Sequence, residues 1–216
     1  MSRSVDVRRL TWWLVLVSAL ALLGYSSRAA AGKPDKDVAY QYSTAVSGLV
    51  QYAIILALVL LIARPDWSLF ALRRPHKPIL SSVLIAFAAI YGASFLVNLY
   101  SDPGREQGLT PQDWDPSRAT PFVVNFVVFA AVAPVVEELT FRGLGYSLLA
   151  PFGAVWACLV VGLTFGLAHG LVEGLPVLVV FGAALAFVRA RTDSVYPGIV
   201  MHALFNAIAL IASVTT

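Results

Sequence analysis

Long apolar stretches recur along the chain, separated by short polar segments. An α-helix rises 1.5 Å per residue, so about 20 apolar residues cross the roughly 30 Å hydrocarbon core of a bilayer. Seven stretches come close to this length: residues 10–27, 45–63, 79–100, 121–149, 152–170, 172–190 and 196–213. The segments between them hold prolines, glycines and charges, as in Gly32-Lys33-Pro34-Asp35. The pattern predicts an all-α, polytopic membrane helical bundle with about seven transmembrane helices.

The composition excludes a soluble globular protein. Of the 216 residues, 59% are hydrophobic and only 12% are charged, and the mean hydropathy is +0.79. Soluble domains have roughly 25% charged residues, and a chain this short has too small an interior to hide so many apolar side chains. We therefore expect membrane lipids around most of the chain. The net charge of +3 is small, and we interpret it as an excess of basic residues in the loops that sets the orientation of the chain. We therefore expect no nucleic-acid partner.

The basic residues predict how the chain is oriented in the membrane. Lysines and arginines gather before the first stretch, after the second and after the sixth: Arg3, Arg8, Arg9, Arg64, Arg73, Arg74, Lys77, Arg189 and Arg191. Cytoplasmic loops retain such residues, so the N-terminus is predicted inside and the C-terminus outside. The alternative for residues 1–31 is a cleaved signal peptide, because Arg8 and Arg9, a short apolar run and Ala29-Ala30-Ala31 also fit that template.

Three charged residues lie inside the fourth apolar stretch, where each costs about 2.5 to 3.5 kcal/mol on insertion scales. They are Glu137, Glu138 and Arg142. Glu138 and Arg142 are four residues apart, so they are neighbours on one helix face and form an ion pair in the favoured order. Glu137 lies about 100° around the helix axis, which leaves it available as a general base. Alternatively, all three charges line a helix contact, or the span ends near Val136.

Two of the three histidines also lie in apolar stretches. His169 ends the run Phe165-Gly166-Leu167-Ala168, and His202 is followed four residues later by Asn206. That spacing places His202 and Asn206 on one face of the last predicted helix. Because the rest of this helix is apolar, we expect these two polar side chains to face a polar partner on another helix.

Helix lengths alone do not bring these groups to one depth. Counted from a turn at Pro151, Glu137 lies about 21 Å and His169 about 27 Å along their helices, whereas His202 lies only about 8 Å past Pro197. We expect helix tilt, a break near Pro134, or a later start of the fifth helix to bring the groups together.

These motifs, in this order, resemble the signature of the CPBP intramembrane proteases, the family of CAAX prenyl proteases and of bacteriocin-processing or immunity proteins. The motifs are Glu-Glu-x-x-x-Arg from Glu137, Phe-x-x-x-His ending at His169, and His-x-x-x-Asn from His202. The resemblance divides the chain into N-terminal helices and loops over residues 1–120 and a catalytic transmembrane core over residues 121–213. It implies a helical membrane bundle that cleaves a peptide bond in a protein or peptide substrate, and we expect a bacterial inner membrane as its location.

The resemblance also implies a role for each matching residue. Glu137 is expected to be the general base and His169 its partner in activating water. His202 and Asn206 are expected to donate hydrogen bonds to the oxyanion, and Glu138 and Arg142 to support the site: catalytic residues Glu137, His169, His202 and Asn206, supporting residues Glu138 and Arg142.

We expect a mechanism without a metal cofactor. Two histidines and a carboxylate could bind Zn²⁺, and zinc is therefore the alternative. The chain, however, has no His-Glu-x-x-His motif, and its only cysteine, Cys158, lies in an apolar stretch where we expect it to pack. Two other functions remain open: a non-catalytic immunity or assembly protein of the same fold, and a small transporter with a proton relay through Glu137 and His169.

Overall fold

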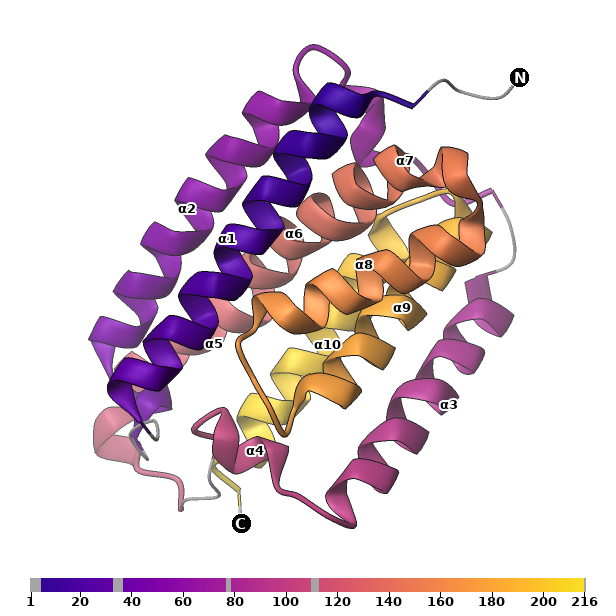
Figure 1. Cartoon of the computed structure of the whole chain (residues 1–216). Coiled ribbons are helices and arrows are strands. Elements are labelled where there is room, and N and C mark those ends of the chain that lie inside the picture. Colours follow the sequence, from indigo (N-terminus) through magenta and orange to yellow (C-terminus); the bar gives the residue numbers. More distant parts are fainter. Residues whose placement is uncertain (1–4, 33–36, 77–78, 110–112, 216) are drawn as a thin grey trace.

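The computed structural model describes residues 5–32, 37–76, 79–109 and 113–215, and within these ranges it is helical with no β-strand (Figure 1). The helices are α1 (Val7–Ala31), α2 (Tyr42–Ala63), α3 (Ile79–Asn98), α4 (Pro103–Glu106), α5 (Ala119–Val127), α6 (Ala133–Glu138), α7 (Tyr146–Leu149), α8 (Ala154–Ala168), α9 (Leu175–Thr192) and α10 (Tyr196–Ala212). Short 3₁₀ turns η1 (Val38–Tyr40) and η2 (Trp67–Phe70) begin and end the region around α2.

Five helical stretches are long and apolar enough to cross a membrane. They are Val7–Ala30, Tyr42–Ala63, Ile79–Asn98, Pro116–Phe152 and Leu175–Thr192. Two shorter apolar helices, Ala154–Ala168 and Tyr196–Ala212, complete the set. The prediction of an all-α membrane bundle with about seven helices is confirmed.

The fourth span is one continuous 37-residue stretch in which two segments widen into π-helix, η4 (Val128–Val132) and η5 (Leu139–Gly145). In η4 the N–H of Ala133 donates to the carbonyl of Val128, five residues back. The next bond of this pattern would join Pro134 to Phe129, but proline has no N–H. The Phe129 carbonyl therefore has no backbone donor in the helix and can accept a hydrogen bond from another group. Such π-helical turns are frequent at functional sites.

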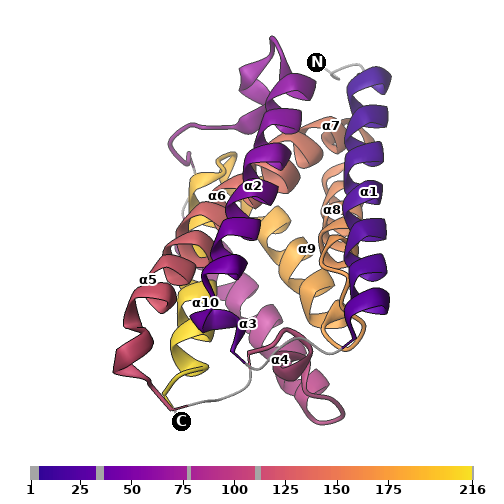
Figure 2. The ribbon, with the colours of Figure 1, turned by 90° about the vertical axis from the view of Figure 1, so that its left-hand side faces the viewer.

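The bundle has a common core to which both halves of the chain contribute. Trp13 of α1 and Val59 of α2 are fully buried in the same cluster as Phe165 of α8 and Leu185 of α9. Trp13 also donates from Nε1 to the carbonyl of Thr140 at 2.9 Å. Helix α1 thus packs against the rest of the bundle, beside α2 and α8 (Figure 2). The first-span interpretation stays a prediction.

The basic segments that follow the second and sixth spans lie together with the N-terminal one at one end of the bundle. A guanidinium N–H of Arg9 donates to the carbonyl of Arg64 at 2.9 Å. Arg73 and Arg189 both pair with Asp193, at 2.6 and 2.9 Å. We call this end the arginine-rich end, and α4 lies at the other (Figure 1). The assignment of the arginine-rich end to the cytoplasm stays a prediction.

Candidate active site

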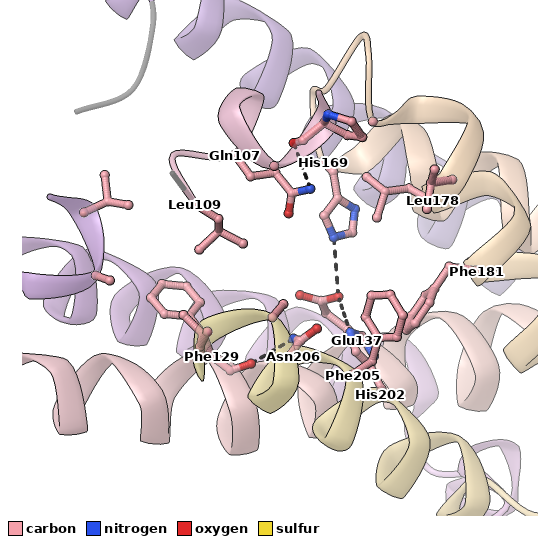
Figure 3. A pocket seen from close by; sticks show the side chains of 18 of the residues that line it. Gln107, Leu109, Phe129, Glu137, His169, Leu178, Phe181, His202, Phe205 and Asn206 are labelled. Carbon is pink, nitrogen blue, oxygen red and sulfur yellow. Dashed lines mark hydrogen bonds and ion pairs between the residues drawn. The ribbon is translucent and has the colours of Figure 1, made fainter. Parts of the chain in front are cut away.

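The side chains of Glu137, His169 and His202 converge at one point inside the bundle, although they come from three different helical segments. Oε2 of Glu137 lies 3.7 Å from Nε2 of His169 and 3.8 Å from Nε2 of His202 (Figure 3). Oε2 is buried and has no hydrogen-bond partner. Both separations are too long for a direct hydrogen bond and suit a bridging water.

The second ring nitrogen of each histidine determines which nitrogen faces Glu137. Nδ1 of His169 lies 2.7 Å from the carbonyl of Phe165, which can only accept, so Nδ1 carries the proton. Nδ1 of His202 lies 3.0 Å from Oε1 of Glu138, a carboxylate oxygen that also accepts from Arg142. In the neutral rings, both Nε2 atoms therefore present lone pairs toward Glu137.

The Glu138–Arg142 pair predicted from its spacing is present and completely buried. Nη1 of Arg142 donates to Oε1 of Glu138 at 2.7 Å, and both side chains are 0% exposed. Nη2 of Arg142 also donates to the carbonyl of Gly182 at 3.2 Å. Because the paired carboxylate holds Nδ1 of His202, the pair connects α6 to α10 and orients the imidazole.

Gly198 lets α10 approach this pair. A Cβ at position 198 would lie 2.5 Å from Oε2 of Glu138, closer than real Cβ contacts come. The glycine stands one turn before His202, so the approach of the two helices at Gly198 sets the distance between His202 and Glu138.

The side chain of Asn206 supplies the hydrogen-bond donor that Pro134 cannot supply to the Phe129 carbonyl. Its Nδ2 donates to the Phe129 carbonyl at 2.8 Å (Figure 3). This bond uses one of the two amide hydrogens and leaves the other for a ligand in the cavity, which Asn206 lines with Glu137, His169 and His202.

Two features of the fold explain how the groups reach one depth. Helix α8 begins at Ala154, later than residue 152, so His169 lies about 22 Å along it, close to the 21 Å counted for Glu137. The turn before α10 is only partly at the surface, since Ser194 and Val195 are fully buried, whereas the Asp193 side chain is about half exposed. Val195 donates to the carbonyl of Ala71, so the segment after α2 covers the turn.

Tyr52 is a site residue that the sequence does not reveal. It lies on α2, and its hydroxyl donates to Oε1 of Glu137 at 3.0 Å. The base is therefore held through Oε1, which leaves Oε2 to face the histidines. A tyrosine in an apolar span gives no signal by itself, and no short-range spacing connects residue 52 with residue 137.

A cavity of about 640 Å³ leads from this point toward the α4 end of the bundle. It is lined by Phe165 and Phe181 beside the converging site residues, and also by Ala39, Gly104 and Gln107. Figure 3 shows Phe181 and Gln107 around the three converging side chains. The lining is mostly apolar with a few polar groups, as is usual for a ligand site. The buried Glu138–Arg142 pair is not among the residues that line it.

The loop that carries His169 is fixed from outside the cavity. Arg28 of α1 donates to the carbonyl of Gly170 at 2.7 Å and pairs with Glu106 at 3.2 Å. The Glu106 carboxylate in turn accepts from the N–H groups of Val172 and Gly174 at 2.7 and 2.8 Å. These bonds hold α4 and the His169 loop together at the mouth of the cavity.

The mechanism without a metal stays a prediction, and the spacing of the site atoms is slightly wider than a tetrahedral zinc site requires. Ligand atoms that share a tetrahedral Zn²⁺ at 2.0–2.2 Å lie about 3.3 to 3.6 Å apart, whereas the two nitrogens are 3.7 and 3.8 Å from Oε2 of Glu137. Across the described part of the chain, no group of three or more His, Cys, Asp or Glu side chains is positioned to hold a metal ion. Glu173, four residues after His169, is exposed and binds the N–H of Asp102 instead.

Comparison with known proteins tests the resemblance to the CAAX proteases. Residues 119–208 match the family model of the Type II CAAX prenyl endopeptidase Rce1-like proteins. The resemblance to the CAAX proteases is confirmed. All six predicted site residues lie within the matched segment, and Tyr52 lies outside it. The proposed boundary near residue 120 stays a prediction.

One relative extends the similarity beyond that segment. The chain is 26% identical over 209 residues to the Bacillus subtilis (strain 168) protein named "Putative membrane peptidase YdiL", and the match covers 92% of this chain and 82% of that protein. No solved structure is significantly similar to the chain. The two matches and the fold together support an integral, multi-pass membrane protein.

Proposed function

We propose that the protein is an intramembrane endopeptidase that hydrolyses a peptide bond with a water activated by Glu137. The observation that carries the proposal is the convergence of Oε2 of Glu137 with two imidazole nitrogens at the inner end of the cavity. Oε2 of Glu137 and Nε2 of His169 are both acceptors, and two acceptors that face each other in a buried place require a proton donor between them.

A water molecule meets this requirement. Placed between the three atoms, it donates one hydrogen to Oε2 of Glu137 and one to Nε2 of His169, and its lone pair points into the cavity. Tyr52 holds the other carboxylate oxygen at 3.0 Å, so the base does not rotate away from the water. General bases placed in this way contribute about 10²- to 10⁴-fold to a reaction rate.

His202 and Asn206 supply the oxyanion donors. Because Nδ1 of His202 already donates to Glu138, Nε2 donates only when the ring is an imidazolium. The ring lies between the carboxylates of Glu137 and Glu138, and the two negative charges of these carboxylates balance the positive charges of the imidazolium and of Arg142. The second amide hydrogen of Asn206 completes the pair, and loss of one such donor costs about 10²- to 10³-fold in kcat.

The atoms of the reaction balance within this set. Glu137 takes a proton from the water as its oxygen attacks the carbonyl carbon, and the negative charge moves to the carbonyl oxygen. When the C–N bond breaks, the proton on Glu137 passes to the leaving amine. The immediate products are a carboxylic acid and an amine. The acid then gives its proton to the amine, which leaves a carboxylate and an ammonium group, and the site returns to its starting state.

We propose that the substrate is a membrane-associated protein or peptide that reaches the site from the α4 end. The cavity reaches that end, where Pro103, Gly104 and Gln107 line it. With the predicted orientation in a bacterial inner membrane, this is the outer face. Leader peptides or C-terminal sorting tails of exported proteins are substrates of that kind.

Chelation decides between the metal-free mechanism and the zinc alternative. We expect full activity after exhaustive treatment with a chelator, because no step above uses a metal. Loss of activity that added Zn²⁺ restores would overturn this part of the proposal.

The proposal is tested in cells by identifying the N- and C-termini of proteins in the membrane and secreted fractions. Wild type is compared with Glu137→Gln, and Glu173→Gln serves as the matched control because Glu173 is exposed and lies outside the cavity. We expect the ends that depend on the wild-type protein to vanish in Glu137→Gln and to persist in Glu173→Gln, with equal protein levels. If Glu137→Gln kept both these ends and the biological activity, the chain would be a non-catalytic member of the fold.

A further inference from the structure

A second hollow lies on the outside of the bundle, away from the active site. It is a groove of about 510 Å³ between α1 and α2. Arg8, Arg9 and Arg64 line one end, and Val15, Ala19 and Leu61 are among the apolar side chains that line the rest. The basic end is complementary to the phosphate of a phospholipid, and the apolar remainder of the groove is complementary to an acyl chain.

The length of the groove corresponds to one leaflet of a membrane. Ala19 lies ten residues after Arg9 on α1, which is about 15 Å along the helix and half of the roughly 30 Å hydrocarbon core. Trp12 and Trp67 are 58% and 51% exposed at the same end, and exposed tryptophans gather where the hydrocarbon meets the headgroups. The arginines therefore lie at headgroup depth, with the apolar part below them.

Among the described residues, the charges at the basic end of the groove are only partly neutralised. Arg9 pairs with Asp6 at 2.9 Å and donates to the carbonyl of Arg64, but its buried Nε has no hydrogen-bond partner. Arg8 and Arg64 are exposed, and neither side chain has an ion pair among the described residues. Three guanidinium groups against one carboxylate leave a net positive charge of two at the mouth of the groove.

We propose that this groove binds an anionic glycerophospholipid, with its phosphate among Arg8, Arg9 and Arg64 and one acyl chain along α1 and α2. Guanidinium groups bind phosphate oxygens with two parallel hydrogen bonds, and basic pockets between transmembrane helices bind such headgroups. Each basic residue near an anionic leaflet contributes about a fivefold preference, equivalent to about 1 kcal/mol. A net charge of two therefore predicts a preference of about 25-fold over a zwitterionic lipid.

Quenching of tryptophan fluorescence by brominated lipids measures this preference. The full-length protein is placed in phosphatidylcholine vesicles that contain a small fraction of dibrominated phosphatidylglycerol or dibrominated phosphatidylcholine. We expect the wild type to bind the brominated phosphatidylglycerol about 25-fold more tightly, and Trp12→Phe to lose most of that quenching because Trp12 lines the groove.

Two sets of variants separate a site from general surface charge. Arg8→Gln with Arg64→Gln is expected to remove nearly all of the preference. Ala19→Phe, which fills the apolar channel and keeps every arginine, is expected to lower it at least fivefold. All three positions are exposed, so equal melting temperatures in detergent check that these variants fold.

The matched control removes two arginines elsewhere at the same end. Arg74 and Arg191 are exposed and do not line the groove, so Arg74→Gln with Arg191→Gln is expected to keep the preference. An equal loss in this control, or an unchanged preference in Ala19→Phe, would overturn the proposal. Neither result depends on peptidase activity.

Discussion

The substitution Gly198→Ala tests whether the approach of α10 to Glu138 sets the geometry of the active site. The new Cβ would lie 2.5 Å from Oε2 of Glu138, whereas ordinary contacts begin at about 3.4 Å. Helix α10 or the carboxylate must therefore move by about 0.9 Å. Glu138 is 0% exposed and bonded to Arg142 at 2.7 Å, so we expect α10 to move and to carry His202 with it.

A displacement of about 1 Å in a catalytic group costs roughly 100-fold in rate. We therefore expect Gly198→Ala to lower kcat/KM about 100-fold, and overpacking to lower the free energy of unfolding by about 1 to 3 kcal/mol. The assay is cleavage of a peptide that spans the site identified from the changed protein ends, with the melting temperature measured in parallel.

Gly92→Ala is the matched control for this substitution. Gly92 lies on α3, and a Cβ there meets nothing within 4 Å. The alanine is expected to leave kcat/KM unchanged and to stabilise the helix slightly. Activity of Gly198→Ala within about twofold of wild type would refute the argument that this helix contact positions His202.

Two further predictions concern Tyr52 and Asp193. Tyr52→Phe is expected to lower kcat at least tenfold with little change in KM, since hydrogen bonds to charged groups contribute about 1.5 to 3 kcal/mol; Tyr42→Phe, exposed on the same helix, is the control, and equal losses in both would contradict it. Burial disfavours the charged form of Asp193, but hydrogen bonds from Arg73 and Arg189 outweigh this and lower its pKa below the usual range. The stabilisation is therefore complete above the ordinary Asp pKa of about 3.9 and is lost as the pH falls through the lowered value. Asp193→Asn, which keeps the left-handed backbone (φ 54°), is expected to melt at a lower temperature than wild type at neutral pH, and the difference should vanish in acid; a constant difference would contradict it.

Helical periodicity predicted those parts of the site that lie within one helix. The spacing of Glu138 and Arg142 predicts their ion pair, and the pair is present with a 2.7 Å bond. The spacing of His202 and Asn206 predicts a shared face, and both line the cavity. Neighbours four residues apart meet whatever the rest of the fold does.

Contacts between helices were beyond such reasoning. The bond from Tyr52 to Glu137 joins α2 to α6 across 85 residues, and it depends on how the two helices pack. The depth of His202 was counted from a turn assumed to lie at the surface, whereas Ser194 and Val195 are buried beneath the segment after α2. The sequence places Pro134 near a helix irregularity but does not specify that the freed Phe129 carbonyl receives Asn206.

The central claim is that Glu137 is the base that activates water. The most direct measurement is the single-turnover cleavage rate of purified full-length protein in lipid vesicles, with peptide in excess of its dissociation constant. We expect Glu137→Gln to bind the peptide as tightly as wild type and to cleave it at least about 10²-fold more slowly, because the amide cannot take the proton. A rate within tenfold of wild type at equal peptide binding would contradict the account.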